Sequence, residues 1–336
     1  MSGLTRYPLK LCSALGSPLK SDTLSGQILC AYREKHGEDA LENLLEEIRS
    51  GELPFRLSDA CPSGYLPLPN FPPIPRKLFQ SLADRHCRGD RYLALQVQKK
   101  RRKELKFIPE QTWLDLRSNA SLYTLMSDWM PKKPEMNWET KTSAEMHNVI
   151  NRFTNSTLES GGIFTVENTW KGKKNSQGIS DGDVKMVLDL YAHVRTDFRA
   201  EFEDLLARIG LTGFGRDASV GMGHFEVLTP KDASSLLECD GANSWLNLST
   251  FSSSDGSVIE DGYCQLRAKF GKVWSGFGEN APFKKPILVA DPGAIIKRLP
   301  KESTTILGDV HPTNPKVIQY SAGVFIPFVL NEKPES

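Results

Sequence analysis

The stretch LTGFGRDASVGMGHFEV, at residues 211–227, has a composition suited to binding a phosphate-bearing ligand. Glycine at this density lets the backbone turn sharply or lets a ligand approach it closely. Backbone N–H groups that converge in such a loop can hold a phosphate or a ribose, and a cation and a hydroxyl within the loop add to that capacity. The candidate binding residues are Gly213, Gly215, Arg216, Ser219, Gly221 and Gly223.

Known nucleotide-binding motifs do not account for this loop. A dinucleotide fingerprint follows a strand and opens a helix, whereas here a predicted helix at 197–209 precedes the loop and a predicted strand at 224–228 follows it. A kinase loop would require downstream catalytic motifs that the sequence lacks, and the pattern GxxxxGK[ST] does not occur in it. Two interpretations stay open, a binding loop and a plain helix-to-strand turn with Gly213 as its C-cap.

The bulk composition excludes several classes of protein. The chain has 336 residues, 39% of them hydrophobic and 25% charged, which is an ordinary balance for one large or two ordinary globular domains. Its net charge is +1, so any basic patch must be local. The six cysteines form no CxxC pair, and we therefore expect no metal, no cofactor and no disulfide framework. No apolar run approaches the roughly 20 residues of a membrane helix, and Pro8 and Lys10 interrupt the first residues, so we expect a cytoplasmic protein.

The spacing of apolar residues predicts an α+β chain. Alternation in TRYPLKLC predicts a half-buried first strand, and two helices follow it, the first capped by Ser21 or Asp22 and the second ending at Gly51. In the second half, VKMVLDLYAHV predicts a strand and residues 197–209 predict a helix. Further candidate strands lie at 244–251, 263–270, 286–290 and 317–330. Strand–helix arrangements in both halves favour two α+β domains.

A second candidate for nucleic-acid contact is the charged run at residues 99–106. This run carries six positive charges and one negative charge. Lysines and arginines that neutralise phosphates release counterions, which makes binding salt-dependent. The alternative is a solvated helix face without a ligand. The residues of this run assigned to RNA contact are Lys99, Lys100, Arg101 and Arg102.

The glycine-rich stretch resembles the signature loop of the RAMP proteins of CRISPR–Cas systems. Further segments, in the same order along the chain, make this resemblance more specific: SDTLSGQILCAYRE, FRLSDACPSGYLPLP, KKRRKELKFIP, HNVINRFTNSTLESGGIFTVENTW and VIQYSAGVFIPFVL. Together they are similar to the subunit that caps the 5′ end of the guide RNA in type III-A (Csm) effector complexes, a relative of the fifth Cas backbone family. The likeness is weakest between Leu116 and Ala144.

This resemblance implies two ferredoxin-like (RRM-like) domains with a glycine-rich loop and a β-hairpin or thumb insertion. The expected N-terminal domain spans residues 1–145 with the basic thumb insertion, and the expected C-terminal domain spans residues 146–336 with the glycine-rich loop. The resemblance also implies a non-catalytic subunit that holds the repeat-derived 5′ handle of the crRNA. Its expected partners are the large polymerase/cyclase-like subunit, the adjacent backbone RAMP subunit and, indirectly, the target RNA, with no membrane.

Two other segments are implied to contact RNA. At the start of the first helix, Ser21 and Thr23 match the family, and free N–H groups there would suit a phosphate. The Asp22 carboxylate would repel that phosphate, so helix capping is the alternative. In HNVINR, the matching residues are His147, Asn148 and Arg152. These side chains can stack on or hydrogen-bond single-stranded bases, and structural packing or a surface ion pair is their alternative role.

The main alternative function is a metal-independent endoribonuclease that cleaves CRISPR repeat RNA. That chemistry requires a general base and acid around the 2′-hydroxyl, typically histidine with tyrosine or lysine. His36, His147 and His224 are the available histidines near candidate RNA-facing segments, but no close set of such residues appears in the first half. A pure protein scaffold is a further alternative, and it would show no salt-sensitive binding to handle RNA.

Overall fold

The computed structural model describes residues 3–132, 138–148, 150–151, 156–157, 163–173, 186–273 and 282–332. Helices and several small sheets share these ranges, which confirms the predicted α+β class. The α-helices are α1 (Ser21–His36), α2 (Glu38–Ser50), α3 (Arg76–His86), α4 (Arg91–Glu104), α5 (Glu110–Leu116), α6 (Leu122–Trp129), α7 (Arg199–Thr212) and α8 (Ser257–Glu260). Among the described residues, no helix is both long and apolar enough to cross a membrane.

The largest sheet has the strand order β11-β1-β10-β2, and each neighbouring pair is antiparallel. Two short strands extend it, because β12 also pairs with β1 and β3 also pairs with β10. The strands of this sheet are β1 (Thr5–Leu11), β2 (Phe55–Leu57), β3 (Cys61–Pro62), β10 (Val187–Val194), β11 (Phe225–Val227) and β12 (Lys231–Asp232).

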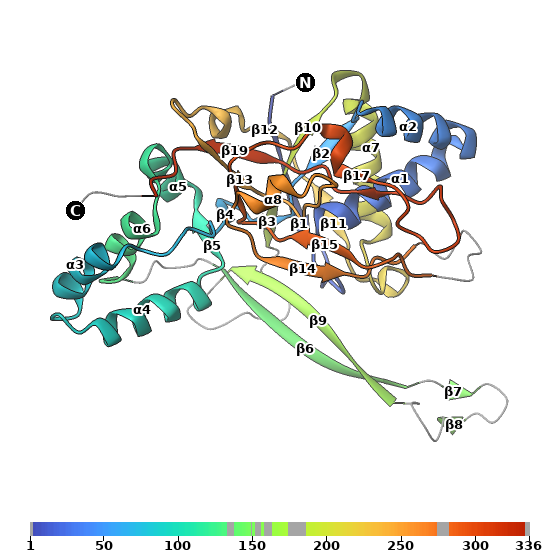
Figure 1. Cartoon of the computed structure of the whole chain (residues 1–336). Coiled ribbons are helices and arrows are strands. Elements are labelled where there is room, and N and C mark those ends of the chain that lie inside the picture. The colour runs from blue at the N-terminus through green and yellow to red at the C-terminus, as the bar shows by residue number, and fades with distance from the viewer. Residues whose placement is uncertain are drawn as a thin grey trace.

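Strand β1 illustrates how the sequence pattern places the core. Tyr7, Leu9 and Leu11 are buried, whereas Lys10 is half-buried on the opposite face. Leu9 lies opposite Leu188 of β10. These side chains join one apolar cluster with residues of α1, α2 and α7, the three helices that cover one face of the sheet (Figure 1). Burial of each leucine side chain contributes about 1.5–3 kcal/mol to folding.

The largest sheet is assembled from two separate parts of the chain. The first part supplies β1, α1 and β2, and the second supplies β10, α7 and β11, which gives a β-α-β-β-α-β path. The boundary predicted between residues 145 and 146 falls inside β6 (Trp138–Asn148). Strands from both sides of that boundary pair directly, with Thr5 opposite Ala192.

Between β3 and β10, the chain first forms a helical lobe from α3 to α6. Its short strands β4 (Tyr65–Pro67) and β5 (Phe107–Pro109) pair with each other. The basic run lies on α4, because residues 91–104 contain neither Gly nor Pro and are mostly good helix formers. That this run belongs to a thumb insertion stays a prediction. Trp113 of α5 is fully buried, and its ring centroid lies 5.1 Å from that of Phe328, so the lobe is attached to the C-terminal strands.

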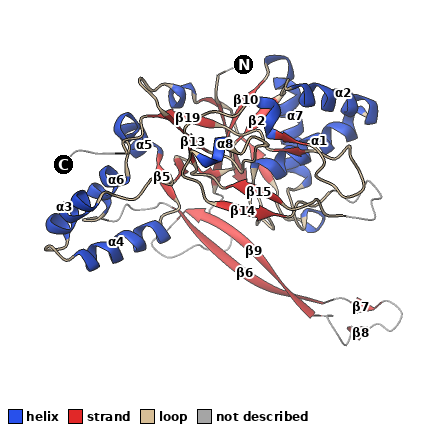
Figure 2. Cartoon of the chain, viewed as in Figure 1, coloured by secondary structure: helices blue, strands red, loops and turns tan. Residues whose placement is uncertain are grey.

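A long two-stranded hairpin follows the lobe and projects from the body of the molecule (Figure 2). Its strands β6 and β9 (Ile163–Lys173) each have 11 residues and pair in register along their whole length, about 36 Å. Two short strands, β7 (Ile150–Asn151) and β8 (Ser156–Thr157), pair with each other beyond them. A two-stranded ribbon of this kind is at best marginally stable alone in water.

The C-terminal residues form three small antiparallel sheets. A three-stranded sheet has the order β16-β13-β19, and two pairs, β14-β15 and β17-β18, stand beside it. Their strands are β13 (Ser244–Asn247), β14 (Leu266–Lys269), β15 (Ile287–Ala290), β16 (Ile295–Ile296), β17 (Ile306–Leu307), β18 (Gln319–Tyr320) and β19 (Phe325–Phe328). Tyr320 packs on Phe55 of β2 with ring centroids 5.0 Å apart, so the C-terminal part shares a core with the largest sheet.

Candidate nucleic-acid interface

The glycine-rich loop joins α7 to β11 and is closed by its own backbone. The amide of Phe214 donates to the carbonyl of Gly223 at 3.0 Å, and the amide of Gly213 donates to that of Ile209 at 2.8 Å. The Phe214 ring is fully buried in the core beneath the sheet and anchors the loop there. The predicted order of helix, glycine loop and strand is therefore confirmed.

The glycines of this loop do not all serve the same purpose. All four adopt positive φ: Gly213 (95°), Gly215 (76°), Gly221 (94°) and Gly223 (76°). Gly223 is buried, and a Cβ there would overlap the carbonyl oxygen of Phe214. Gly213 is also buried, and a Cβ there would lie 2.6 Å from the carbonyl oxygen of Met222. These two glycines are needed because the chain approaches itself, whatever ligand the loop binds.

The other two glycines, Gly215 and Gly221, lie on the exposed side of the loop. A Cβ at Gly215 would lie 2.9 Å from the Cβ of Ser17, so this glycine lets a second loop approach. A Cβ at Gly221 would meet nothing within 4 Å. Gly221 is therefore the position where a ligand could reach the main chain without displacing protein atoms.

The loop between β1 and α1, residues 12–20, packs directly against the glycine-rich loop. The amide of Arg216 donates to Ser17 Oγ at 3.2 Å, and the amide of His224 donates to Ser13 Oγ at 2.9 Å. The amide of Gly223 donates to the carbonyl of Ala14 at 2.7 Å. We call residues 12–20 and 213–224 together the loop pair. The sequence analysis did not single out the first loop, although Gly16 in the motif SALGSP indicates a position where the backbone can pack closely.

The exposed tip of the loop pair combines polar and apolar groups. Arg216, Ser219 and Val220 are exposed there, and Val220 is 70% exposed. The Arg216 guanidinium pairs with the carboxylate of Asp217, with Nε and Oδ2 3.0 Å apart. A phosphate bound by Arg216 would therefore also meet this carboxylate, which opposes binding at short range. The main chain of the tip carries no formal charge, and the amides of Val220, Gly221 and Met222 already donate to carbonyls within the loop, those of Asp217 and Ala218.

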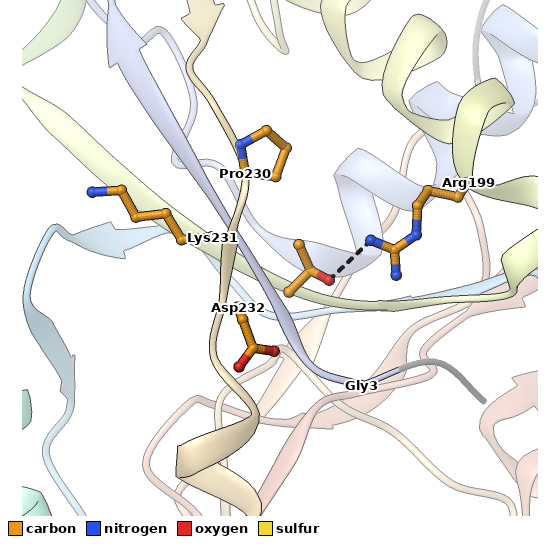
Figure 3. A pocket seen from close by; sticks show the side chains of 6 residues that line it. Gly3, Arg199, Pro230, Lys231 and Asp232 are labelled. Atoms are coloured by element: carbon orange, nitrogen blue, oxygen red, sulfur yellow. Dashed lines mark hydrogen bonds between the residues drawn. The ribbon is translucent and has the colours of Figure 1, made fainter.

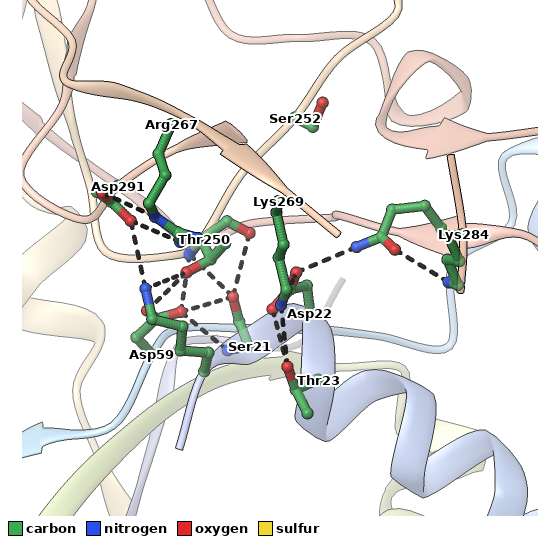
Figure 4. A network of polar contacts seen from close by, with 12 residues as sticks. Ser21, Asp22, Thr23, Asp59, Thr250, Ser252, Arg267, Lys269, Lys284 and Asp291 are labelled. Carbon is green, nitrogen blue, oxygen red and sulfur yellow. Dashed lines mark hydrogen bonds and ion pairs between the residues drawn. The ribbon is translucent and has the colours of Figure 1, made fainter. Parts of the chain in front are cut away.

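The start of α1 is closed by a polar network (Figure 4). The N-cap residue is Lys20 and makes no side-chain cap, so the predicted capping by Ser21 or Asp22 is wrong. Ser21 is buried, and its hydroxyl donates to Asp59 Oδ1 at 2.8 Å and accepts from the amide of Thr250 at 3.0 Å. The Ser21 hydroxyl is therefore already hydrogen-bonded within the protein, because the C-terminal part packs over this helix end.

Thr23 and Asp22 meet strand β14 at the same helix end. Lys269 Nζ lies 2.6 Å from the fully buried Asp22 carboxylate and 3.0 Å from Thr23 Oγ1. Lys284 also faces this carboxylate, and burial lowers the pKa of Lys284 to about 8. Burial raises the pKa of Asp59. Thr23 is exposed beside the Lys269 ammonium, so a phosphate here would meet a hydroxyl and a cation that is already paired.

The basic run lies on α4, in the helical lobe, away from the end of α7 and from β11 (Figure 1). The Arg101 side chain turns toward the lobe, and its Nε donates to the carbonyl of Trp129 at 3.0 Å. Lys100 forms a long ion pair with Glu104, at 4.0 Å. Lys99 and Arg102 are exposed. The structure therefore does not bring this run together with the loop pair.

The remaining predicted contacts lie near the far end of the hairpin. His147 and Asn148 are the last two residues of β6, and His147 lies opposite Phe164 of β9. Arg152 lies outside the described residues. These backbone positions place the segment at the projecting end of the molecule (Figure 1).

The described histidines proposed for ribonuclease chemistry do not gather at one site. His36 is the last residue of α1, a helix about 24 Å long, and its Nε2 lies 2.8 Å from Glu201. His224 follows the glycine-rich loop, and its amide donates to Ser13 Oγ in the loop that precedes α1. Among the described residues, no group of three or more His, Cys, Asp or Glu side chains could hold a metal ion.

A shallow polar pocket lies beside the first strand (Figure 3). Its volume of about 210 Å³ is below the range of roughly 300–1,000 Å³ that suits small-molecule ligands. Arg199 already donates to Thr5 Oγ1 at 3.4 Å, and Lys231 and Asp232 line the pocket together. This pocket is therefore a weaker candidate site than the loop pair.

No protein-family model matches the sequence, and no curated protein matches it either. Solved structures do match the fold. A chain of the "Csm3-Csm4 subcomplex in the type III-A CRISPR-Cas interference complex" superposes with a TM-score of 0.55 at 15% identity, covering 97% of this chain and 99% of that chain. A chain of the "Csm1-Csm4 cassette in complex with cA4" superposes with a TM-score of 0.53 at 18% identity, covering 100% of both. The component common to both assemblies is Csm4, and this chain has a Csm4-like fold over nearly its whole length.

Proposed function

We propose that this chain is a non-catalytic RNA-binding subunit of a type III CRISPR–Cas interference complex, and that it caps the 5′ repeat-derived handle of the crRNA. The observation that carries the proposal is the loop pair. It presents exposed main chain at Gly215 and Gly221 beside Arg216 and Ser219, in a chain with a Csm4-like fold. Main-chain groups and hydroxyls of this kind hold the sugar-phosphate backbone without reading bases.

The β-α-β-β-α-β path supports a ferredoxin-like (RRM-like) identity for the domain that carries the loop pair. In this proposal, residues 63–186 are a long insertion between its second and third strands, and the C-terminal sheets form a second domain related to the first. The hairpin β6–β9 then acts as the thumb, which reaches from the body toward RNA held by the neighbouring subunit. His147 and Asn148 lie where such a thumb would meet nucleotides, because they end β6.

The proposed protein partners follow from the two matched assemblies. One pairs Csm4 with Csm3 and the other pairs it with Csm1. We propose that this chain likewise links a large polymerase/cyclase-like subunit to a backbone RAMP subunit, with the target RNA held indirectly. A linking subunit needs at least two separate protein surfaces, and the projecting hairpin and the C-terminal sheets provide two candidates.

The absence of bond-breaking activity is part of the proposal. Cleavage beside a 2′-hydroxyl needs a general base and a general acid within reach of one another. His36 is paired with Glu201 at the C-terminal end of α1, whereas His224 lies beside Ser13, in the loop that precedes α1. This separation favours a capping role over the alternative, a metal-independent endoribonuclease.

A binding and cleavage assay tests the proposal. Purified chain is mixed with end-labelled CRISPR repeat RNA in EDTA, over a series of salt concentrations. We expect salt-dependent binding and an intact RNA. Site-specific cleavage would support the endoribonuclease instead, and the lack of any salt-sensitive binding would support a pure protein scaffold.

A further inference from the structure

The strand pair β14–β15 stands at the outside of the C-terminal part, with β14 as the outer strand. Strand β15 is attached to the body, because Ala290 and Phe251 exchange backbone hydrogen bonds of 2.7 and 3.0 Å. Ser252 Oγ also donates to the carbonyl of Leu288 at 2.8 Å. Strand β14 pairs with β15 alone among the described strands. Its other edge therefore carries backbone donors and acceptors that no described strand satisfies.

The register of β14 is fixed by ion pairs on its inner face. Arg267 pairs with Asp291 at 3.0 Å, and Lys269 pairs with Asp22 at 2.6 Å (Figure 4). Side chains alternate between the two faces of a strand, so Leu266, Ala268 and the following Phe270 must face outward. A shift by one residue would expose the inner cations and leave the buried Asp22 carboxylate without Lys269, although Gln319 would still donate to it.

The outer face of this strand pair is apolar although it is open to solvent. Ala268 lies opposite Leu288, and Leu266 and Phe270 flank Ala268 on the same face. The exposed fractions are 46% for Leu266, 65% for Phe270, 56% for Phe283 and 54% for Leu288. An open antiparallel face normally carries polar side chains, and a cluster of large exposed apolar residues marks a contact site. We call this cluster with the free edge of β14 the outer ridge.

One end of the outer ridge carries two lysine side chains, one of which is paired with an acid. Lys272 is exposed and lies opposite Phe283, and Lys285 follows on the other strand. The Lys285 ammonium pairs with the exposed Asp309 carboxylate at 2.8 Å. Among the described residues, the outward-facing side chains of the strand pair carry no charge, so this face offers little to a phosphate backbone. Apolar side chains with the Lys272 cation at one end instead complement an apolar segment that ends in a carboxylate.

We propose that the outer ridge is a protein-binding site that receives an added β-strand from another protein subunit of the effector complex. This inference rests on the proposed function, which supplies the assembly. The added strand pairs with the free edge of β14, places apolar side chains against Leu266 and Phe270, and directs an acidic side chain toward Lys272. Main-chain hydrogen bonds give such strand addition its affinity, and alternate side chains give it specificity. A neighbour at this edge also removes the aggregation hazard of an open apolar strand.

Hydrogen–deuterium exchange gives the most direct test. Exchange is measured on the isolated chain and on the effector complex purified with its RNA and all its protein subunits. We expect those amides of residues 266–270 that point to the free edge of β14 to exchange quickly in the isolated chain and at least about tenfold more slowly in the complex. Equal exchange rates in the two samples would overturn the proposal.

A double substitution on the outer ridge, compared with a control variant, tests whether the ridge binds a protein subunit. The double variant Leu266→Glu and Phe270→Glu is compared with Leu299→Glu, which adds acid at another exposed leucine of the C-terminal part. We expect the double variant to fold normally and to weaken retention of one protein subunit by at least about 30-fold, as for a hot spot of 2 kcal/mol. The Leu299 variant should assemble normally.

Three other outcomes would overturn the proposal: unchanged subunit content, loss of RNA with all subunits retained, or self-association of the wild-type chain that the double variant abolishes while assembly continues. RNA content is measured in the same samples. If RNA is missing even from the wild-type complex, the proposed function fails, and the strand addition is then judged from the exchange data alone.

Discussion

The glycine-rich loop and helix α4 are both proposed to contact RNA, but for different physical reasons. The loop has a fixed shape, since Gly213 and Gly223 are packed against the chain's own carbonyl groups. Helix α4 has a fixed shape too, but its Lys99 and Arg102 side chains extend from an ordinary helix face. In the proposed function, the loop would select RNA by its geometry, whereas α4 would contribute chiefly a salt-dependent positive potential.

The largest expected effect is the difference in stability between substitutions at two glycines of the loop. Gly223→Ala should lower the free energy of unfolding by about 3–5 kcal/mol, because a methyl group would overlap the Phe214 carbonyl at positive φ. Gly221→Ala should lower it by only about 1–2 kcal/mol, because its strain is conformational and the space is open. Urea unfolding of the two isolated variants gives the comparison. Equal losses would mean that the loop is not closed by its own packing.

The next effect concerns RNA retention. Replacing Gly215 and Gly221 with leucine should reduce the crRNA content of the assembled complex at least about tenfold, because side chains would cover the exposed main chain and separate the loop pair. Gly241→Leu is the matched control, since Gly241 also has positive φ and open space around it. Unchanged RNA content in the double variant would remove the loop pair from the site.

A smaller effect is expected on α4. Replacing Lys99 and Arg102 with alanine should reduce the slope of log K against log salt by about 1.4, or about 0.7 for each lost contact with single-stranded RNA. Arg101→Ala serves as the comparison, because that side chain already bonds the Trp129 carbonyl and should change the slope less. Fluorescence anisotropy with repeat RNA measures both slopes. An identical slope for the double variant and the wild type would make this run a solvated face.

The smallest expected effect is a gain in affinity for handle RNA. Asp217→Asn removes the carboxylate that pairs with Arg216, and asparagine tolerates the positive φ of 62° found there. Handle RNA should then bind about 2–5-fold more tightly, in line with a surface ion pair of up to about 1 kcal/mol. Weaker binding by this variant would show that Arg216 does not contact phosphate.

Short stretches of sequence predicted the elements that carry the loop pair, because apolar periodicity and the residues that end a helix or strand are both local signals. The alternation around Leu9 gave β1, and the apolar spacing from Phe202 to Ile209 gave most of α7. The pairing of Thr5 with Ala192 could not be read the same way, because no local signal links residues so far apart. For that reason the sequence could not show that strands from both sides of residues 145 and 146 pair in one sheet, and the domain boundary there stays a prediction.

The same difference between local signals and long-range contacts applies to individual site residues. The glycines of the loop were visible as a dense motif, and their positive φ values are its physical basis. The burial of Ser21 against Asp59 was not visible, because it depends on Thr250 arriving from the C-terminal part. The roles of Ser13 and Ser17 were likewise missed, since an isolated serine in a loop carries no sign of its distant hydrogen-bond donor.

Photo-crosslinking of the assembled complex tests the central claim most directly. A guide RNA that carries 4-thiouridine in its 5′ handle is incorporated, irradiated and mapped to peptides by mass spectrometry. The account predicts handle crosslinks to residues 12–20 and 213–224, on both members of the loop pair. Handle crosslinks confined to α4, to the hairpin or to another subunit would contradict it.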